Sequence, residues 1–130
     1  SDAFNEIMAA RKLSKATESE QAARLTAIHD ATLQAAQVPL ESARESLEAL
    51  KLCLRMAEIG NLTAISDAGA GVNLAVAAVR AAGMNVKINL LGLENESEPA
   101  AMLAEIKAIQ AEAEQKLAEV TRVIAERAGF

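Results

Sequence analysis

The amino-acid sequence predicts an all-α protein: a bundle of long antiparallel helices, one of which is kinked at a proline. Apolar residues recur at three- and four-residue steps along most of the chain, which is the spacing of one face of an α-helix. Aromatic residues make up only 2% of the composition. The core must therefore consist of small aliphatic side chains, which suit closely packed helices better than strands. We expect residues 1–130 to form a single helical domain, because this length is typical of one domain.

The first half of the chain contains two predicted helical segments. DAFNEIMAARKL at the start has its apolar residues at helical spacing, and the polar segment SKATESEQ is typical of a connection. A long helical segment follows, from about residue 20 to residue 59. Pro39 lies within it, lacks a backbone donor and clashes with the preceding turn. We therefore expect a kink or break near Val38, with Pro39 in the first turn of a new helix.

The second half contains two further predicted helices. Gly60, which tolerates a positive φ, ends the long segment, and NLTAIS forms a short loop. Ser66 is a good N-cap, so the next helix is predicted from Asp67 to about Leu91. After the loop GLENESEP, Ser97 caps the last helix, whose apolar residues form a coiled-coil-like stripe.

Composition and charge argue against several classes of protein. The net charge of −5 does not favour a nucleic-acid-binding protein, which usually carries a basic face. The single Cys53 has no partner for a disulfide and lies in an apolar run, so we expect a buried structural thiol. The polar start SDAFNEIM does not resemble a signal peptide, and we expect a cytoplasmic protein. The Ala-rich run AGAGVNLAVAAVRAAG contains Asn73 and Arg80, which favours a buried core helix over a membrane span.

Two polar clusters stand out from the Ala/Leu background. GNLTAISDAG gathers Asn61, Ser66 and Asp67 at a helix entrance, and on residue types alone ordinary capping explains it. NVKIN places Asn85 and Asn89 four residues apart on one helix face. Buried amides need hydrogen-bond partners, which either a neighbouring helix or a polar ligand can supply.

Metal and histidine chemistry find little support in the sequence. There is one histidine, His29, and no HExxH, CxxC or P-loop motif. We interpret His29 as a partly exposed helix residue rather than a catalyst, and we expect no metal site and no cofactor.

Four segments, in this order, resemble the cyclodeaminase/cyclohydrolase domain of the formiminotransferase-cyclodeaminase family. DAFNEIM resembles the family's acidic-AFN helix, AAQVPLESA its AxxVPL segment, GNLTAISDAG its GNxNAISDAG loop and NVKIN its NVRIN element. Thr63 stands where the family has Asn, and Lys87 where it has Arg. The family's glycine-rich SGGGS segment would precede residue 1, so the resemblance implies the C-terminal portion of that domain.

This resemblance implies a homodimeric helical enzyme of one-carbon metabolism that acts on a tetrahydrofolate derivative. Members of the family either close 5-formiminotetrahydrofolate to the 5,10-methenyl form with loss of ammonia, as in histidine degradation, or open the methenyl form with water. It implies neither a metal nor a redox cofactor, and no nucleic-acid or membrane partner. Two other hypotheses remain open: a non-catalytic helical assembly module, and an inactive remnant that still binds folate.

The resemblance also implies roles for particular residues. Asp67 is the expected general acid/base or the carboxylate that binds the pterin edge. Asn61, Ser66, Asn85 and Asn89 would orient the substrate, and Lys87 would neutralise a glutamate tail or a developing charge. We expect Asp67, Asn85 and Asn89 to converge on one pocket.

Overall fold

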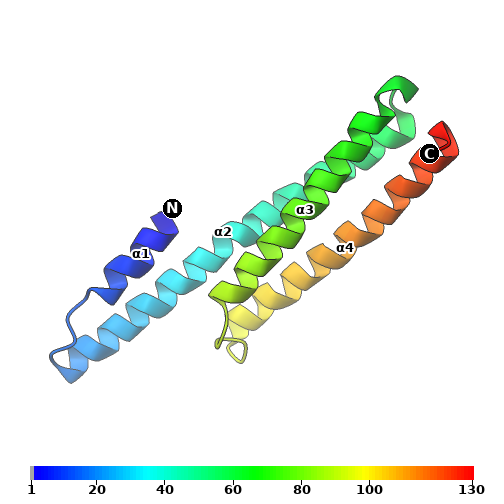
Figure 1. Ribbon diagram of the computed structural model, residues 1–130. Coiled ribbons are helices and arrows are strands. Elements are labelled where there is room, and N and C mark those ends of the chain that lie inside the picture. The colour runs from blue at the N-terminus through cyan, green and yellow to red at the C-terminus, as the bar shows by residue number, and fades with distance from the viewer. Residues whose placement is uncertain (1) are drawn as a thin grey trace.

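The computed structural model describes residues 2–130, and these residues form four α-helices and one short 3₁₀ helix (Figure 1). No strand occurs within this range, which confirms the predicted all-α class. The helices are long for a chain of this size, with 42 residues in the second and 32 in the fourth. The elements are α1 (Asp2–Arg11), α2 (Glu18–Ile59), η1 (Leu62–Ala64), α3 (Ile65–Asn89) and α4 (Ser97–Ala128).

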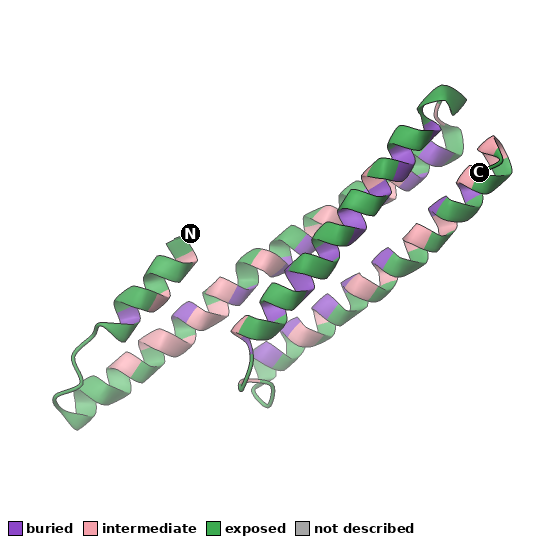
Figure 2. Cartoon of the chain, viewed as in Figure 1, coloured by how far each residue is buried: buried purple, intermediate pink, exposed green. Residues whose placement is uncertain are grey.

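The hydrophobic core lies where α2, α3 and α4 meet. α3 runs antiparallel to both of the other helices, while α1 lies alongside the N-terminal half of α2 (Figure 1). Fully buried aliphatic side chains come from all three core helices, among them Leu40 and Leu50 of α2, Val79 and Val86 of α3, and Ile106 of α4. The buried residues of each helix face its neighbours, and the opposite faces are exposed (Figure 2).

Of the kink or break expected near Val38, no break occurs, and Pro39 does not begin a new helix: α2 is one uninterrupted helix with Pro39 inside it. Because proline has no backbone N–H, it cannot donate to the carbonyl four residues earlier in the helix. Here that acceptor is the carbonyl of Ala35. In the structure the side-chain Nδ2 of Asn89, on α3, donates to that carbonyl oxygen at 3.5 Å. Leu40, next to the proline, is fully buried in the core. The adjacent helix thus supplies both a replacement donor and packing across the site of the proline.

Two predicted helix starts differ from those observed. Ser66 does not cap α3, which begins at Ile65 after η1, and its N-cap residue makes no side-chain capping bond. The side chain of Asn61 accepts from the backbone N–H of Thr63 instead, at 3.1 Å, so the capping takes place one turn earlier. Ser97 is the first residue of α4 and does not cap it.

The C-terminus of α2 is closed differently from the prediction. Gly60 ends the helix in an extended conformation, with φ −71°, and not with a positive φ. The last carbonyls of α2 receive their donors from α4: Arg127 donates to the carbonyl of Ala57 and, at 3.1 Å, to that of Gly60. A cation at this position also suits the negative end of the α2 dipole. α2 has no basic residue of its own in its last turn.

Two bidentate ion pairs fasten α4 to the other core helices. Arg44 of α2 donates to both carboxylate oxygens of Glu105, at 2.6 and 2.9 Å. Arg80 of α3 does the same to Glu114, at 2.7 and 2.8 Å. The hydrogen bonds from Arg44 hold the pKa of the Glu105 carboxyl below its usual value. Because these pairs are partly exposed, they set the position of α4 more than they stabilise the fold.

The segment Leu62–Asn89, which consists of η1 and α3, has the length and composition of a membrane span. The α3 part is packed within the chain. In the structure, ten of its residues are buried against other parts of the chain. Its glycines allow that packing: the Sγ of Cys53 lies over Gly71, the Cδ1 of Ile124 over Gly69, and the side-chain amide of Gln110 over Gly83. Cys53, predicted to be buried, is half-buried at this contact.

Candidate functional site

The largest hollow that contains predicted site residues is lined by α1, α2 and α3. It has a volume of about 510 Å³, within the range of small-molecule sites. Asn85 and Asn89 of α3 form its polar wall, and we call it the Asn85 hollow. The residues that line it are Ala3, Phe4, Ile7, Ala35, Val38, Pro39, Ser42, Ala78, Ala82, Asn85 and Asn89.

The two asparagines are held in place by the helix backbone. Asn85 Nδ2 donates to the carbonyl of Ala81 at 3.1 Å, and Asn89 Nδ2 donates to the carbonyl of Asn85 at 2.9 Å. A side-chain amide has two donor N–H groups and an acceptor oxygen. Among residues 2–130, the hydrogen bonds of Asn85 and Asn89 use only the donor groups. Their Oδ1 atoms can therefore accept hydrogen bonds from a ligand.

Asp67 lies at the other end of α3, in a separate and smaller hollow. This Asp67 hollow has a volume of about 220 Å³. Asp67 and Asn85 are eighteen residues apart on one helix, and at the helical rise this separation is about 27 Å. The expected convergence of Asp67 with Asn85 and Asn89 within one chain is therefore wrong. The residues that line the Asp67 hollow are Cys53, Met56, Gly60, Asn61, Ala64, Asp67 and Ala68.

Ser66 and Lys87 lie outside both hollows. Ser66 is exposed in the first turn of α3. Lys87 Nζ donates to Oε1 of Gln110 on α4 at 3.1 Å, on the side of α3 that faces away from the Asn85 hollow. The structure thus brings together Asn85 and Asn89, and separately Asn61 and Asp67.

Sequence reasoning about single residues missed part of the Asn85 hollow. Phe4 of α1 is exposed at its edge, Pro39 and Ser42 of α2 form another side, and all three belong to segments that carry the resemblance. The signal was in the motifs: the AFN and VPL segments supply the apolar wall that faces the NVKIN segment. An exposed aromatic ring beside paired amides suits a flat heterocycle, which stacks on one and hydrogen-bonds to the other.

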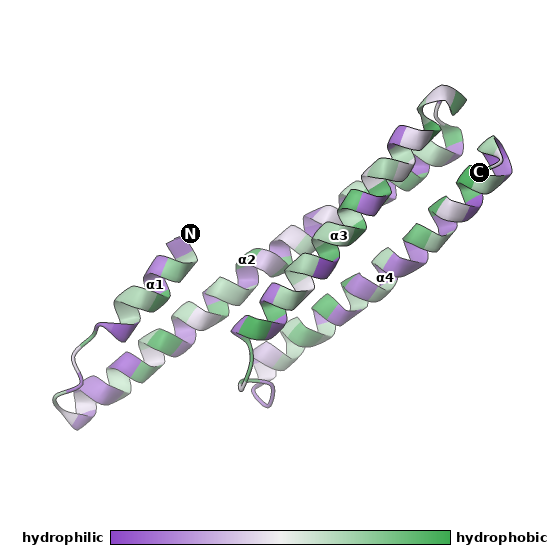
Figure 3. Cartoon of the chain, viewed as in Figure 1, coloured by the Kyte–Doolittle hydropathy of each residue, from purple (hydrophilic) through white to green (hydrophobic). Residues whose placement is uncertain are grey.

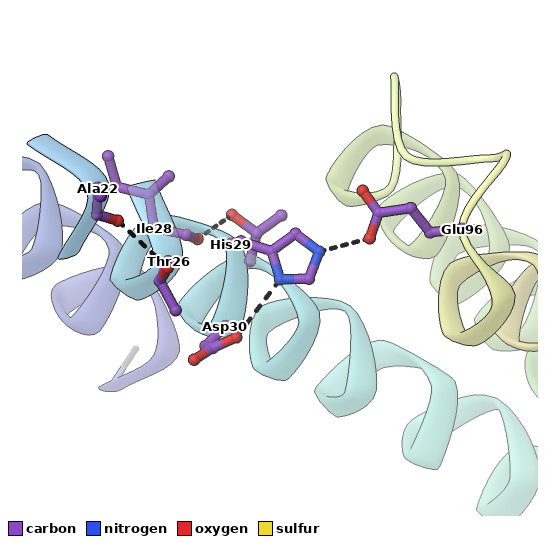
Figure 4. A network of polar contacts seen from close by, with 7 residues as sticks. Ala22, Thr26, Ile28, His29, Asp30 and Glu96 are labelled. Atoms are coloured by element: carbon purple, nitrogen blue, oxygen red, sulfur yellow. Dashed lines mark hydrogen bonds and ion pairs between the residues drawn. The ribbon is translucent and has the colours of Figure 1, made fainter. Parts of the chain in front are cut away.

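A third hollow, of about 410 Å³, shares Ile7 and Asn89 with the Asn85 hollow and contains Arg11 and His29. His29 Nε2 lies 2.6 Å from a carboxylate oxygen of Glu96, in the loop before α4, and its Nδ1 lies 3.4 Å from Asp30 (Figure 4). The hydrogen bond to Glu96, followed by that to Asp30, raises the pKa of His29.

The lining of the Asn85 hollow contains no ionisable residue. Within residues 2–130, no group of three or more His, Cys, Asp or Glu side chains is placed to hold a metal ion. The hollow can therefore bind and orient a polar heterocycle, but a carboxylate that exchanges protons would have to come from elsewhere.

The comparisons with known proteins agree with the motifs. The sequence profile of the formiminotransferase-cyclodeaminase family matches residues 1–108. A methenyltetrahydrofolate cyclohydrolase from Methylorubrum extorquens is 40% identical over 112 residues, which are 86% of this chain and 54% of that protein. The chain therefore spans about half the length of this relative. The matched region contains α1, α2, α3 and the first part of α4. On this evidence the chain belongs to the formiminotransferase-cyclodeaminase family.

Proposed function

We propose that this chain carries the folate-binding part of a one-carbon enzyme, a methenyltetrahydrofolate cyclohydrolase or a formiminotetrahydrofolate cyclodeaminase, and that the Asn85 hollow receives the pterin. The observation that supports this most is the lining of the hollow, where three of the four resembling segments meet. The similarity to a cyclohydrolase favours the water reaction over the ammonia reaction.

The Asn85 hollow suits a reduced pterin in size and chemistry. The ring has apolar faces and an edge of N–H donors, and the Oδ1 atoms of Asn85 and Asn89 can accept from such donors. Phe4 and Pro39 supply apolar surface for the faces of the ring.

The proposed chemistry needs a group that moves a proton. In the cyclohydrolase reaction, water adds to the methenyl carbon between N5 and N10, and the tetrahedral adduct then opens at one nitrogen. A positioned base that accepts the proton from water contributes roughly 10²–10⁴-fold to such a step. Asp67 is the carboxylate we propose for this role, with Asn61 lining the same hollow and Ser66 next to it in the sequence. Because Asp67 lies about 27 Å from Asn85 of the same chain, this role requires the proposed homodimer to bring it to the pterin. Lys87, for which the resemblance implies contact with the glutamate tail, is bonded to Gln110 on the other side of α3, so we leave it out of the proposed pterin site.

We include a homodimer and a cytoplasmic setting in this proposal, as the family resemblance implies. Participation in histidine degradation would follow only if the cyclodeaminase reaction is the physiological one. The two activities differ in their substrates and products. The cyclohydrolase consumes 5,10-methenyltetrahydrofolate and water, whereas the cyclodeaminase consumes 5-formiminotetrahydrofolate and releases ammonia.

An absorbance assay for the loss of 5,10-methenyltetrahydrofolate tests the proposal. The unmodified chain should accelerate the loss above the uncatalysed rate. Asn85→Ala should raise KM, because it removes an oxygen that orients the pterin. Asn73→Ala is the matched control: Asn73 lies on the same helix and donates to the carbonyl four residues earlier at 2.9 Å, but it does not line the Asn85 hollow. This control should behave like the unmodified chain.

Calorimetry with the same folate separates the alternatives. In one outcome, the unmodified chain binds the folate and Asn85→Ala weakens this binding, while the chain neither converts methenyltetrahydrofolate nor releases ammonia from 5-formiminotetrahydrofolate. That result would indicate a folate-binding remnant and overturn the catalytic proposal. If the chain neither binds nor converts either folate, the hypothesis of a helical assembly module replaces it. If Asn85→Ala and Asn73→Ala change KM and folate affinity equally, the pterin does not bind in the Asn85 hollow.

A further inference from the structure

We propose that Ser42 of α2 is a further binding residue of the Asn85 hollow, and that with Asn85 and Asn89 it forms a set of hydrogen-bond acceptors. This set selects a ring that carries an exocyclic amino group. The identity of that ring, a reduced pterin, rests on the proposed function.

Ser42 brings a second helix to the polar part of the Asn85 hollow. Three polar side chains line the hollow: Ser42 comes from α2, whereas Asn85 and Asn89 come from α3. α3 is mostly hydrophobic, so its two asparagines are among its few polar residues (Figure 3). The other side chains of the lining are apolar. A ring in the hollow would therefore meet polar side chains from two adjacent helices and apolar surface elsewhere.

The hydroxyl hydrogen of Ser42 is already used in a hydrogen bond to the backbone. Its Oγ donates to the carbonyl oxygen of Val38, four residues earlier in α2, at 3.2 Å. Because a carbonyl can only accept, the hydrogen must lie between these two atoms, and the lone pairs of Oγ remain available. Ser42 therefore offers the hollow an acceptor and not a donor.

The amide of Asn89 is oriented in the same sense. Its Nδ2 donates to the carbonyl of Asn85 at 2.9 Å and to that of Ala35 at 3.5 Å. A flipped amide would place Oδ1 against these two carbonyl oxygens, with no hydrogen between them. Pro39 favours the observed orientation, because it has no N–H to donate to the Ala35 carbonyl. Asn89 thus presents its oxygen to a ligand.

Acceptors on two helices favour a ligand whose donors point in two directions. The exocyclic amino group of a pterin has two diverging N–H groups, so it can donate to Ser42 on α2 and to an asparagine oxygen on α3 at once. A methyl group in the same place has a similar size but donates nothing, and it would leave the acceptors without partners. The hollow should therefore discriminate between the two rings.

Calorimetry with two folates tests this selectivity. 5-Formyltetrahydrofolate carries the 2-amino group, and its 2-desamino-2-methyl analogue carries a methyl group instead. We expect the unmodified chain to bind the amino folate about tenfold more tightly than the methyl folate. Ser42→Ala should weaken binding of the amino folate about fivefold and leave that of the methyl folate almost unchanged. Ser42→Thr keeps the hydroxyl and should keep the affinity ratio of the unmodified chain.

Ser46→Ala is the matched control. Ser46 Oγ donates to the carbonyl four residues earlier in the same helix, at 2.7 Å, but Ser46 does not line the Asn85 hollow. This variant should bind both folates as the unmodified chain does. Alanine favours the helix more than serine, so neither substitution should unfold α2.

Two results would overturn the role of Ser42. An affinity ratio that Ser42→Ala leaves unchanged would show that Ser42 does not contact the amino group. Equal affinity of the unmodified chain for the two folates would show that the hollow does not recognise this group at all.

Smaller rings separate this inference from the proposed function. 2-Amino-4-hydroxypyrimidine contains the amino-bearing edge without the rest of a folate, and 2-methyl-4-hydroxypyrimidine is its counterpart. NMR follows the side-chain amide signals of Asn85 and Asn89 while each ring is added at millimolar concentration. If the chain binds neither folate, the proposed function fails. Shifts caused by the amino ring alone would then still support the set of acceptors, whereas equal shifts from both rings, or none, would overturn it.

Discussion

At the scale of single residues, Asn89 shows how one side chain connects two motifs. Pro39 of the VPL segment removes the backbone donor that Ala35 would otherwise receive, and Asn89 of the NVKIN segment donates to that carbonyl. The bond also fixes one side of the Asn85 hollow, because all three residues line it. The sequence predicts that Asn89 needs a hydrogen-bond partner. One partner is the carbonyl of Ala35, which receives no backbone donor because of Pro39.

A double-mutant cycle tests this connection. Pro39→Ala restores a backbone N–H that can donate to the Ala35 carbonyl, so this carbonyl no longer depends on the hydrogen bond from Asn89. We expect Asn89→Ala to lower the free energy of unfolding by about 1 kcal/mol more in the unmodified chain than in the Pro39→Ala chain. Urea titrations of the four proteins measure this coupling. Additive effects of the two substitutions would show that the bond contributes nothing.

His29 offers a second test at this scale, since it is the single histidine of the chain. Its pKa is raised chiefly by the hydrogen bond to Glu96. NMR titration should therefore give a pKa above the ordinary value of about 6.5, and Glu96→Gln should lower it. Asp30→Asn should lower it less, because Asp30 is the weaker partner.

The sign of the effect on stability follows by linkage. A histidine whose pKa is higher in the folded state binds protons more tightly there, so folding is favoured at low pH. The contribution is fully present below the unfolded pKa and is lost as the pH rises through the folded pKa. The difference in unfolding free energy between the unmodified chain and Glu96→Gln should be largest below about pH 6.5 and fall above it. A difference that does not change with pH would show that Glu96 acts on the α3–α4 loop by some other contact.

At the scale of elements, the order and approximate extent of the helical segments could be predicted, and their ends could not. Periodicity is averaged over many residues, so single exceptions leave it intact. A helix end depends on one or two side chains: Asn61 caps η1, and α3 then begins directly after η1 at Ile65, before Ser66. The predicted break at Pro39 failed for a related reason, because the donor that Asn89 supplies is remote in sequence.

The packing of α2 against α3 depends on Gly71. A Cβ at this position would lie 2.7 Å from the Sγ of Cys53. Gly71→Ala gains about 1 kcal/mol in helix propensity but overpacks the contact, which costs about 1–3 kcal/mol. We therefore expect a net loss of about 1 kcal/mol in the free energy of unfolding. In a Cys53→Ala background the clash disappears, and the same substitution should stabilise by about 1 kcal/mol relative to that background. Destabilisation of equal size in both backgrounds would place the strain elsewhere.

At the scale of the whole molecule, the candidate site could be predicted only in parts. Residue types identified Asn85 and Asn89 as a pair, and the structure places both in one hollow. The further expectation that Asp67 joins them within one chain conflicts with the helical rise, which separates residues 67 and 85 by about 27 Å. That conflict was already present in the sequence, since both residues were assigned to the same helix. The helical rise alone therefore excludes Asp67 from the lining of the Asn85 hollow of its own chain.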